Sequence, residues 1–204
     1  MGARVRRLFL LSPASSSGRR SRMLLAPRAS FALALGVRRP EGEPIGAVFS
    51  FLSGLYFRGK LTYARHFAQP GGIRVITSDR GLVAPELPVT LEDLRAMARG
   101  SIDAENAAYR MPLRRDAELL ASELGPEGEV VLLGSIATGK YAEVLHAAFG
   151  ERLKFPESFV GRGDMSRGGL LLRAVREDRE LSYLRWAGAV LRGKRPARLE
   201  RAPR

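Results

Sequence analysis

Residues 130–145 read VVLLGSIATGKYAEVL, and this stretch decides the fold class of the chain. A continuous apolar run leads into a glycine-framed loop, and apolar residues then recur at helical spacing until Gly150. The buried stripe of this helix contains Tyr141, Val144, Leu145, Ala148 and Phe149. A strand that passes through a short loop into a helix is the repeating unit of α/β proteins.

The rest of the chain alternates in the same way. Strands are expected at 30–36, 73–77, 129–133 and 152–155, and helices at 53–69, 90–98, 112–124 and 141–149. Thr90 and Asp93 have the spacing of a capping box. Residues 170–175 and 180–188 are predicted to form a hairpin. The pattern predicts an α/β fold with a mainly parallel central sheet, covered by helices on both faces, with a C-terminal antiparallel hairpin.

The positive charge is concentrated at the two ends of the chain. Of the net charge of +13, residues 1–40 carry +9 and residues 192–204 carry +5, which leaves −1 for residues 41–191. A nucleic-acid-binding domain concentrates positive charge on folded faces, so this distribution is weak evidence for a nucleic-acid partner.

Composition excludes several other classes of protein. The chain has no Cys and two His, which excludes a disulfide framework and disfavours a metal site built on these residues. No apolar run approaches the roughly 20 residues that span a bilayer. We therefore expect a soluble, cytoplasmic protein with no membrane partner and no structural metal.

Residues 1–22 are rich in Arg and Ser and free of acids. Three interpretations fit: an extension before a true start at Met23, which the use of Arg over Lys supports; a transit peptide; or a basic arm for nucleic acid. All three place the segment outside the fold. We expect a single α/β domain at 23–190 and disordered basic tails at 1–22 and 191–204.

The loop after residue 133 matches a phosphate-binding loop in part. Gly134, four residues, Gly139 and Lys140 have the P-loop spacing, but Tyr141 replaces the magnesium-binding Ser or Thr. No later strand ends in the acidic residue that such an enzyme needs, so we exclude a P-loop NTPase. Backbone N–H groups at a helix N-terminus still favour an anion. The alternative is a plain strand-to-helix turn with Lys140 solvated.

The fold itself predicts where a ligand binds, because ligands of open α/β sheets lie beyond the carboxyl ends of the strands. This rule selects the loops after 73–77, 129–133 and 152–155. Asp79 and Asp164 are the predicted catalytic residues, as general base or Mg²⁺ ligand. The predicted ligand-binding residues are Lys60, Gly134, Ser135, Thr138, Gly139, Lys140, Arg162, Ser166 and Arg167. For Lys60, on an apolar helix face, the alternative is a stem that carries the ammonium to solvent.

Two classes of function follow from these residues. The first is an enzyme, a hydrolase or transferase acting on a nucleotide-like or other phosphorylated small molecule, with Mg²⁺ as a candidate cofactor. The second is a non-catalytic module that binds nucleic acid or protein through the basic tails. A pocket lined by Asp79, Lys140 and Asp164 favours the enzyme, and a flat stripe of Arg favours the binding module.

Three segments resemble a family of uncharacterised bacterial proteins, a domain of unknown function. They are FLSGLYFRGKLTYA at 51–64, LLGSIATGKY at 132–141 and FVGRGDMSRGGLLLR at 159–173. LYFRGKLTYA followed by IRVITSDRGLVAPE also looks like a pattern of small phage and bacterial α/β proteins of unknown function. The resemblance covers residues 23 to 190, implies an α/β fold without the N-terminal tail, and assigns no catalytic residue.

Overall fold

The central strand of the sheet comes from the N-terminal segment of the chain. The computed structural model describes residues 6–15, 18–103, 105–136, 139–187, 189, 193 and 196–197. Within them, six strands form one sheet in the order β4-β3-β1-β6-β7-β8. These strands are β1 (Arg7–Leu11), β3 (Ile73–Ile76), β4 (Leu82–Val83), β6 (Glu129–Leu133), β7 (Leu153–Pro156) and β8 (Tyr183–Arg185).

The sheet is mainly parallel, as predicted. β1 pairs in parallel with β3 and β6, and β6 with β7, whereas β4 and β8 pair antiparallel at the two edges. A separate short pair consists of β2 (Glu43–Pro44) and β5 (Pro88–Val89). The α/β fold with an antiparallel pair at the C-terminal end of the sheet is confirmed.

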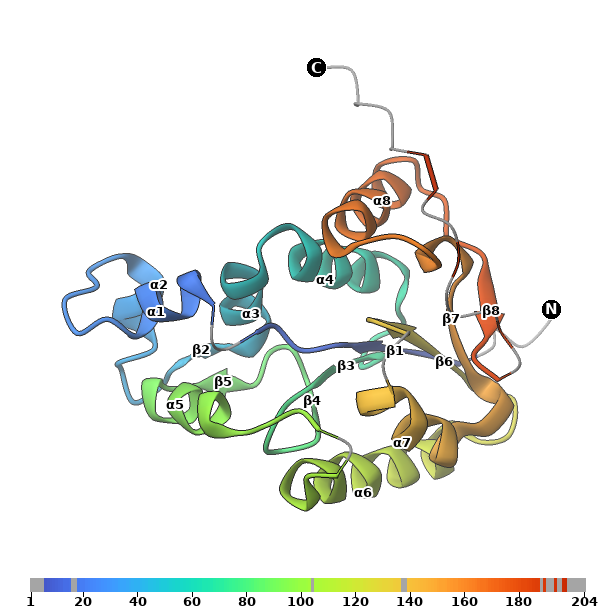
Figure 1. Cartoon of the computed structure of the whole chain (residues 1–204), viewed down its shortest axis with the longest axis horizontal. Helices are drawn as coiled ribbons and strands as arrows, with labels where there is room; N and C mark the ends of the chain where they lie inside the picture. Colours follow the sequence, from blue (N-terminus) through green and yellow to red (C-terminus); the bar gives the residue numbers. More distant parts are fainter. Residues whose placement is uncertain are drawn as a thin grey trace.

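Helices cover both faces of the sheet. Figure 1 shows α3, α4 and α8 on one face and α6 and α7 on the other, with α1, α2 and α5 grouped beyond the carboxyl end of β1. Phe9 and Leu11 of β1 enter the core beneath α4 and α8, and Leu8 and Leu10 pack toward α6 and α7. The helices are α1 (Arg19–Leu25), α2 (Ala32–Gly36), α3 (Ile45–Ser53), α4 (Leu55–Phe67), α5 (Leu91–Arg99), α6 (Ala107–Leu124), α7 (Gly139–Phe149) and α8 (Asp164–Arg176).

The N-terminal segment is the main correction to the sequence-based prediction. β1 is buried at the centre of the sheet and α1 packs near α3, so residues 6–15 and 18–22 belong to the fold. The prediction that 1–22 form a disordered tail outside the domain is wrong for these described residues. Arg7 is accommodated because it pairs with Glu129 (2.8 Å) and Glu180 (2.6 Å). The tail predicted at 191–204 falls almost wholly outside the described residues.

Two segments predicted as strands are helical. Residues 32–36 form α2, because Ala and Leu favour a helix and the segment has no β-branched residue. Residues 170–175 belong to α8, so β8 pairs with β7 and a helix joins the two strands in place of a hairpin turn. The predicted strands at 152–155 and 170–175 leave a long loop at 156–169, but this loop is short, since α8 already begins at Asp164.

The other predicted elements are confirmed with small shifts in their bounds. α4, β3, β6, β7 and α7 lie where the sequence predicts them. α5 begins with the predicted capping box, in which Asp93 N–H donates to Thr90 Oγ1 and the Asp93 carboxylate accepts from Thr90 N–H. α6 begins earlier than expected, at Ala107, and Pro112 lies inside it.

Candidate functional site

A cleft of about 420 Å³ opens at the carboxyl ends of β1 and β6. The crossover that follows β1 runs through α3 and α4 on one face of the sheet, and the crossover that follows β6 runs through α7 on the other (Figure 1). This is the topological switch point, where α/β sheets bind ligands. The polar residues of the lining include Ser12, Ser135, Lys140, Tyr141 and Asp164, and Leu52 and Ile102 are among its apolar residues.

Lys60 of α4 lies beneath this cleft as a buried amine. The residue is 1% exposed, and Nζ donates to the carbonyl oxygen of Ser12 (2.6 Å) and to Ser12 Oγ (2.9 Å). Nζ also lies over the rings of Tyr56 and Phe57, at 4.5 and 4.8 Å from their centroids. Lys60 is therefore held inside the protein by Ser12 and two aromatic rings, and its stem does not carry the ammonium to solvent.

Burial has a direct effect on the charge of Lys60. Loss of hydration lowers the pKa of Lys60 to about 7. The negative charge of Asp164 opposes this shift of the pKa, and the positive charge of Arg167 adds to it. Lys60 therefore gains and loses its proton near neutral pH, unlike a lysine at the surface.

Tyr141 closes the loop that partly matches a phosphate-binding loop. Its hydroxyl accepts a hydrogen bond from the N–H of Ser135 (2.7 Å). Burial raises the pKa of Tyr141, and a hydrogen bond with the Ser12 side chain opposes that rise. The residue that departs from the P-loop pattern thus satisfies the Ser135 N–H, which is then not free for a phosphate.

Gly134 makes this arrangement of hydroxyl groups sterically feasible. A Cβ at residue 134 would lie 2.7 Å from the Cβ of Ser12 and 2.9 Å from the hydroxyl of Tyr141. Contacts this short do not occur between real atoms of these types. The first glycine of the loop is therefore required for the approach of Ser12 to Tyr141.

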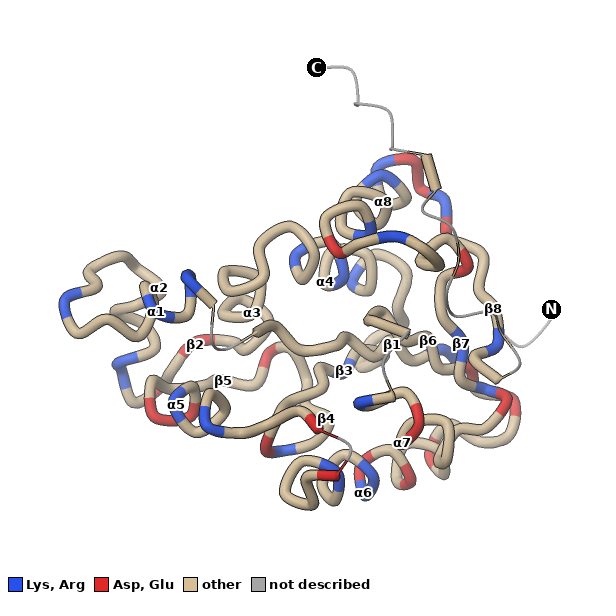
Figure 2. The backbone as a smooth tube through the Cα atoms, viewed as in Figure 1, with Lys and Arg blue, Asp and Glu red and all other residues tan. Residues whose placement is uncertain are grey.

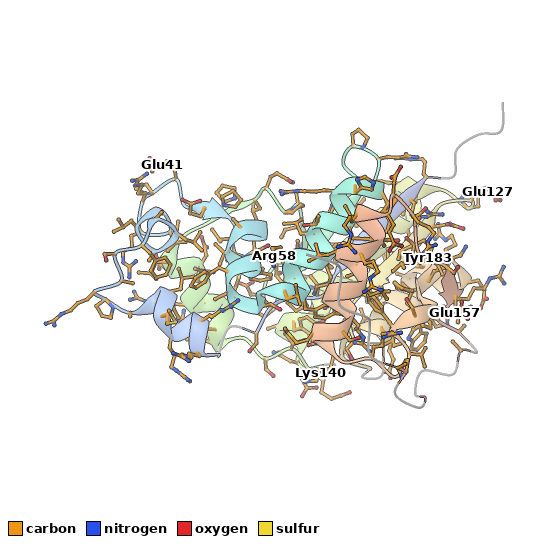
Figure 3. All side chains as sticks on the ribbon, turned by 90° about the horizontal axis from the view of Figure 1, so that it is seen from above. Glu41, Arg58, Glu127, Lys140, Glu157 and Tyr183 are labelled. Carbon is orange, nitrogen blue, oxygen red and sulfur yellow. The ribbon has the colours of Figure 1, made fainter. Side chains whose placement is uncertain are left out.

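Two charged residues lie on the lining, each in the first turn of a helix. Lys140 of α7 is exposed, and Figure 3 shows it at the edge of the molecule. Asp164 of α8 has a side chain that is 69% exposed. Arg167 supports this wall from inside: it donates from Nε and Nη2 to the carbonyl oxygen of Phe159 (3.3 and 3.0 Å), and its Nη1 lies 3.7 Å from Asp164.

Asp79, a predicted catalytic residue, is not among the residues that line the cleft. Its carboxylate pairs with Arg80 at 3.1 Å in the turn after β3, and Arg80 also pairs with Asp93 at 3.0 Å. Arg80 thereby links this turn to the first turn of α5. The predicted pocket of Asp79, Lys140 and Asp164 is therefore present only in part, with Lys140 and Asp164 on one lining and Asp79 elsewhere.

Four other predicted residues also lie off the lining or outside the described part of the chain, namely Thr138, Gly139, Arg162 and Ser166. Arg162 donates from Nη1 to Ser166 Oγ at 3.2 Å, which ties the turn before α8 to its first turn. Gly139 is the first residue of α7. Thr138 lies outside the described residues.

Ser12 and Tyr56 are the functional candidates that sequence reasoning missed. Ser12 was assigned to the N-terminal tail, although the preceding run LFLL carries the signal of a buried strand. Tyr56 lies on the apolar side of the helix predicted at 53–69, and this position favours a role in the core. Tyr56 belongs to the lining of the cleft, and its buried hydroxyl lies next to the Arg167 side chain, which can only donate to it, so the described residues supply no acceptor for the hydroxyl proton. Burial raises the pKa of Tyr56, so the phenol keeps its proton.

Comparisons with protein-family models, curated proteins and solved structures found no match to this chain. The resemblance of three segments to an uncharacterised bacterial family therefore stays a prediction. All three segments nevertheless reach the cleft, since they contribute Tyr56 and Lys60, Lys140 and Tyr141, and Asp164, respectively.

Neither a cluster of metal-binding side chains nor a membrane-spanning helix occurs in the part of the chain that the structure describes. No three His, Asp or Glu residues gather there in a position to hold a metal ion. No helix within the described residues is long and apolar enough to cross a membrane.

Proposed function

We propose that the cleft binds a small molecule with an anionic, phosphate-like group, of which a nucleotide-like molecule is the best candidate. The observation that carries this proposal is the position of Lys60, a buried amine directly behind Ser12 at the floor of the cleft. Among the described residues it forms no ion pair with a carboxylate. With a pKa of about 7, a fraction of this amine is charged near neutral pH, and an anion in the cleft stabilises that charged fraction.

Three other features support an anionic ligand. Lys140 brings a second positive charge to the same lining, at the N-terminus of α7, where the helix dipole also favours negative charge. The hydroxyl of Tyr56 is a buried donor that lies next to Arg167 and finds no acceptor among the described residues. These donors and charges converge on one concave surface, as ligand sites require.

The other end of the cleft suits an apolar ring. Leu52 and Ile102 line it there, and together with Pro13 they also line a small adjoining apolar cavity of about 20 Å³. Asp164 lies on the lining as an acceptor for a ligand hydroxyl group. An apolar ring, hydroxyl groups and a phosphate are the parts of a nucleotide, and each has a matching residue type here.

A non-catalytic module that binds through basic tails has less support. Figure 2 shows Lys and Arg dispersed among Asp and Glu over the helices and loops. Several arginines of the N-terminal segment also have partners within the protein. Arg7 pairs with two glutamates, Arg20 donates to the carbonyl oxygen of Phe51 (3.1 Å), and Arg38 donates to that of Ala26 (2.7 Å).

A thermal-shift series tests the proposed ligand class. A ligand that binds only the native state raises the melting temperature, so nucleosides, their monophosphates and sugar phosphates are compared at equal concentration. We expect nucleotides to raise the melting temperature more than the matching nucleosides. Equal shifts from nucleoside and nucleotide would contradict the anionic part of the proposal.

Lys140→Ala should weaken binding of the best nucleotide by about 1.5–3 kcal/mol, the range for a hydrogen bond to a charged group. The melting temperature without ligand should barely change, because Lys140 is exposed. The measurement is a titration by calorimetry of both proteins.

Arg58→Ala is the matched control for Lys140→Ala. Arg58 is exposed on α4 and is not among the lining residues, so this change removes one positive charge away from the cleft (Figure 3). Affinity should stay unchanged. An equal loss of affinity in the two variants would mean that overall charge, and not a contact of Lys140, attracts the ligand.

A further inference from the structure

Ser12 places a hydroxyl group on the floor of the cleft. It follows directly after β1, and its N–H donates to the carbonyl oxygen of Leu133 (3.1 Å), so the sheet ladder fixes its position. The residue is 6% exposed and belongs to the lining. Its Oγ lies 2.9 Å from Lys60 Nζ. A hydroxyl next to a buried amine, facing a cleft, has the geometry of an activated nucleophile.

The contacts of Lys60 suit the neutral amine as well as the ammonium. A neutral amine has two N–H donors and one lone pair. The carbonyl oxygen of Ser12, at 2.6 Å, accepts one N–H, and the lone pair is then able to accept the proton of Ser12 Oγ. A serine hydroxyl is a weak nucleophile until a base takes this proton, and a lysine serves as the base in some serine hydrolases.

The groups around Lys60 favour its neutral form near physiological pH. Tyr56 on its own helix and Tyr141 on α7 stay protonated, because burial raises the pKa of both. From α8, Asp164 and Arg167 act on Lys60 in opposite directions. Burial therefore dominates and brings the pKa of Lys60 to about 7, so a large fraction of the amine is neutral at this pH.

We propose that Ser12 and Lys60 form a serine–lysine dyad, with Ser12 as the nucleophile and Lys60 as the general base of an acyl hydrolase or acyltransferase. The dyad uses the cleft of the proposed function, and its substrate class is an ester or thioester that also bears an anionic group. Ser12 Oγ forms a bond to the carbonyl carbon while its proton passes to Lys60 Nζ. Tyr56, on the same lining, donates to the oxygen that becomes negative.

The remaining steps return the dyad to its starting state. The tetrahedral intermediate collapses, the bond to the leaving oxygen or sulfur breaks, and the Lys60 ammonium gives its proton to the leaving group. A water or an acceptor hydroxyl then loses a proton to Lys60 and attacks the acyl group on Ser12. The Ser12 Oγ bond breaks and Oγ regains the proton from Lys60, so atoms and charges balance.

Labelling with an alkyl fluorophosphonate tests the nucleophile without knowledge of the substrate. Ser12 Oγ attacks phosphorus, fluoride leaves and Lys60 takes the proton. We expect a single adduct by intact-protein mass spectrometry, located on Ser12 by peptide mapping. Ser12→Ala should abolish the adduct, and Ser182→Ala, an exposed serine outside the lining, should leave it unchanged. No adduct, or an adduct on another serine in the unmodified protein, would overturn the proposal.

The role of Lys60 is tested by the pH profile and by one variant. The labelling rate of the unmodified protein should rise with pH, reach half its maximum near pH 7 and level off about one pH unit higher, because only the neutral amine accepts the proton. Lys60→Met should slow labelling by roughly 10²–10⁴-fold, the range for removal of a general base. If Lys60→Met does not fold, the profile still decides: a rate independent of pH between about pH 5.5 and 8 overturns the proposal.

The two proposals fail separately. If Ser12 is labelled but nucleotides cause no thermal shift, the proposed dyad stands and the proposed nucleotide ligand is refuted. If nucleotides raise the melting temperature but Ser12 is not labelled, the proposed ligand stands and the proposed dyad is refuted.

Discussion

A chain that begins at Met23 should not fold. Deleting residues 1–22 removes β1, whose Phe9, Leu10 and Leu11 are completely buried and whose backbone joins β3 to β6. Each buried Leu or Phe side chain contributes roughly 1.5–3 kcal/mol. Together with the two lost strand ladders, this loss is comparable to the whole stability of a domain, about 5–15 kcal/mol. Circular dichroism during heating should show no cooperative transition for residues 23–204.

Two substitutions in the full chain separate the loss of the strand from the loss of charge. Leu10→Asp places a charge in the core between the sheet and the helices α6 and α7, and it should also abolish cooperative unfolding. Arg6→Ala removes a positive charge from an exposed residue of the same segment, with one hydrogen bond to the Glu123 carbonyl oxygen, and should cost little. A cooperative transition in the chain from Met23 would show that β1 is dispensable.

The sequence predicts the elements around β6 well because local signals agree there. The run of 129–133, the loop glycines and the stripe of α7 all point to a strand followed by a helix. β1 was missed because its apolar run lies in a segment whose Arg and Ser content resembles a tail. A composition averaged over residues 1–22 hides a strand as short as Arg7–Leu11. β1 is buried because it pairs with β3 and β6, which lie far from it in the sequence, so no local pattern predicts its burial.

The candidate site was predicted from the sequence only in part, because one of its walls depends on β1. Lys140 and Asp164 were selected because ligands of α/β sheets bind beyond the carboxyl ends of the strands. Lys60 was selected because it lies on an apolar helix face. The rule did not exclude Asp79, because it selects every loop at the carboxyl edge, whereas this cleft lies between β1 and β6. Ser12 depends on the position of β1. Once β1 was assigned to a tail, its carboxyl end was not among the candidates.

The predicted strands at 152–155 and 170–175 leave Gly168 in the loop between them, yet Gly168 lies inside α8, which packs against α4. A Cβ at Gly168 would lie 2.8 Å from the carbonyl oxygen of Leu55 and 2.9 Å from the Cα of Tyr56. A Cβ at Gly59 of α4 would likewise lie 2.8 Å from the carbonyl oxygen of Gly168. These neighbours are backbone atoms, which cannot rotate away, so the pair of glycines sets the distance between the two helices.

Gly168→Ala should therefore destabilise the protein by about 1–3 kcal/mol or more, the usual cost of overpacking. Ala favours a helix interior over Gly by about 1 kcal/mol, so a net loss means that the clash costs more than this gain. Because α4 carries Tyr56 and Lys60 and α8 carries Asp164, the folded variant should also label more slowly at Ser12.

Gly163→Ala is the control, since a Cβ there meets nothing within 4 Å, and it should cost under about 1 kcal/mol. The measurement is the free energy of unfolding of both variants from urea denaturation. A Gly168→Ala protein as stable as the unmodified chain would refute a backbone contact between α4 and α8.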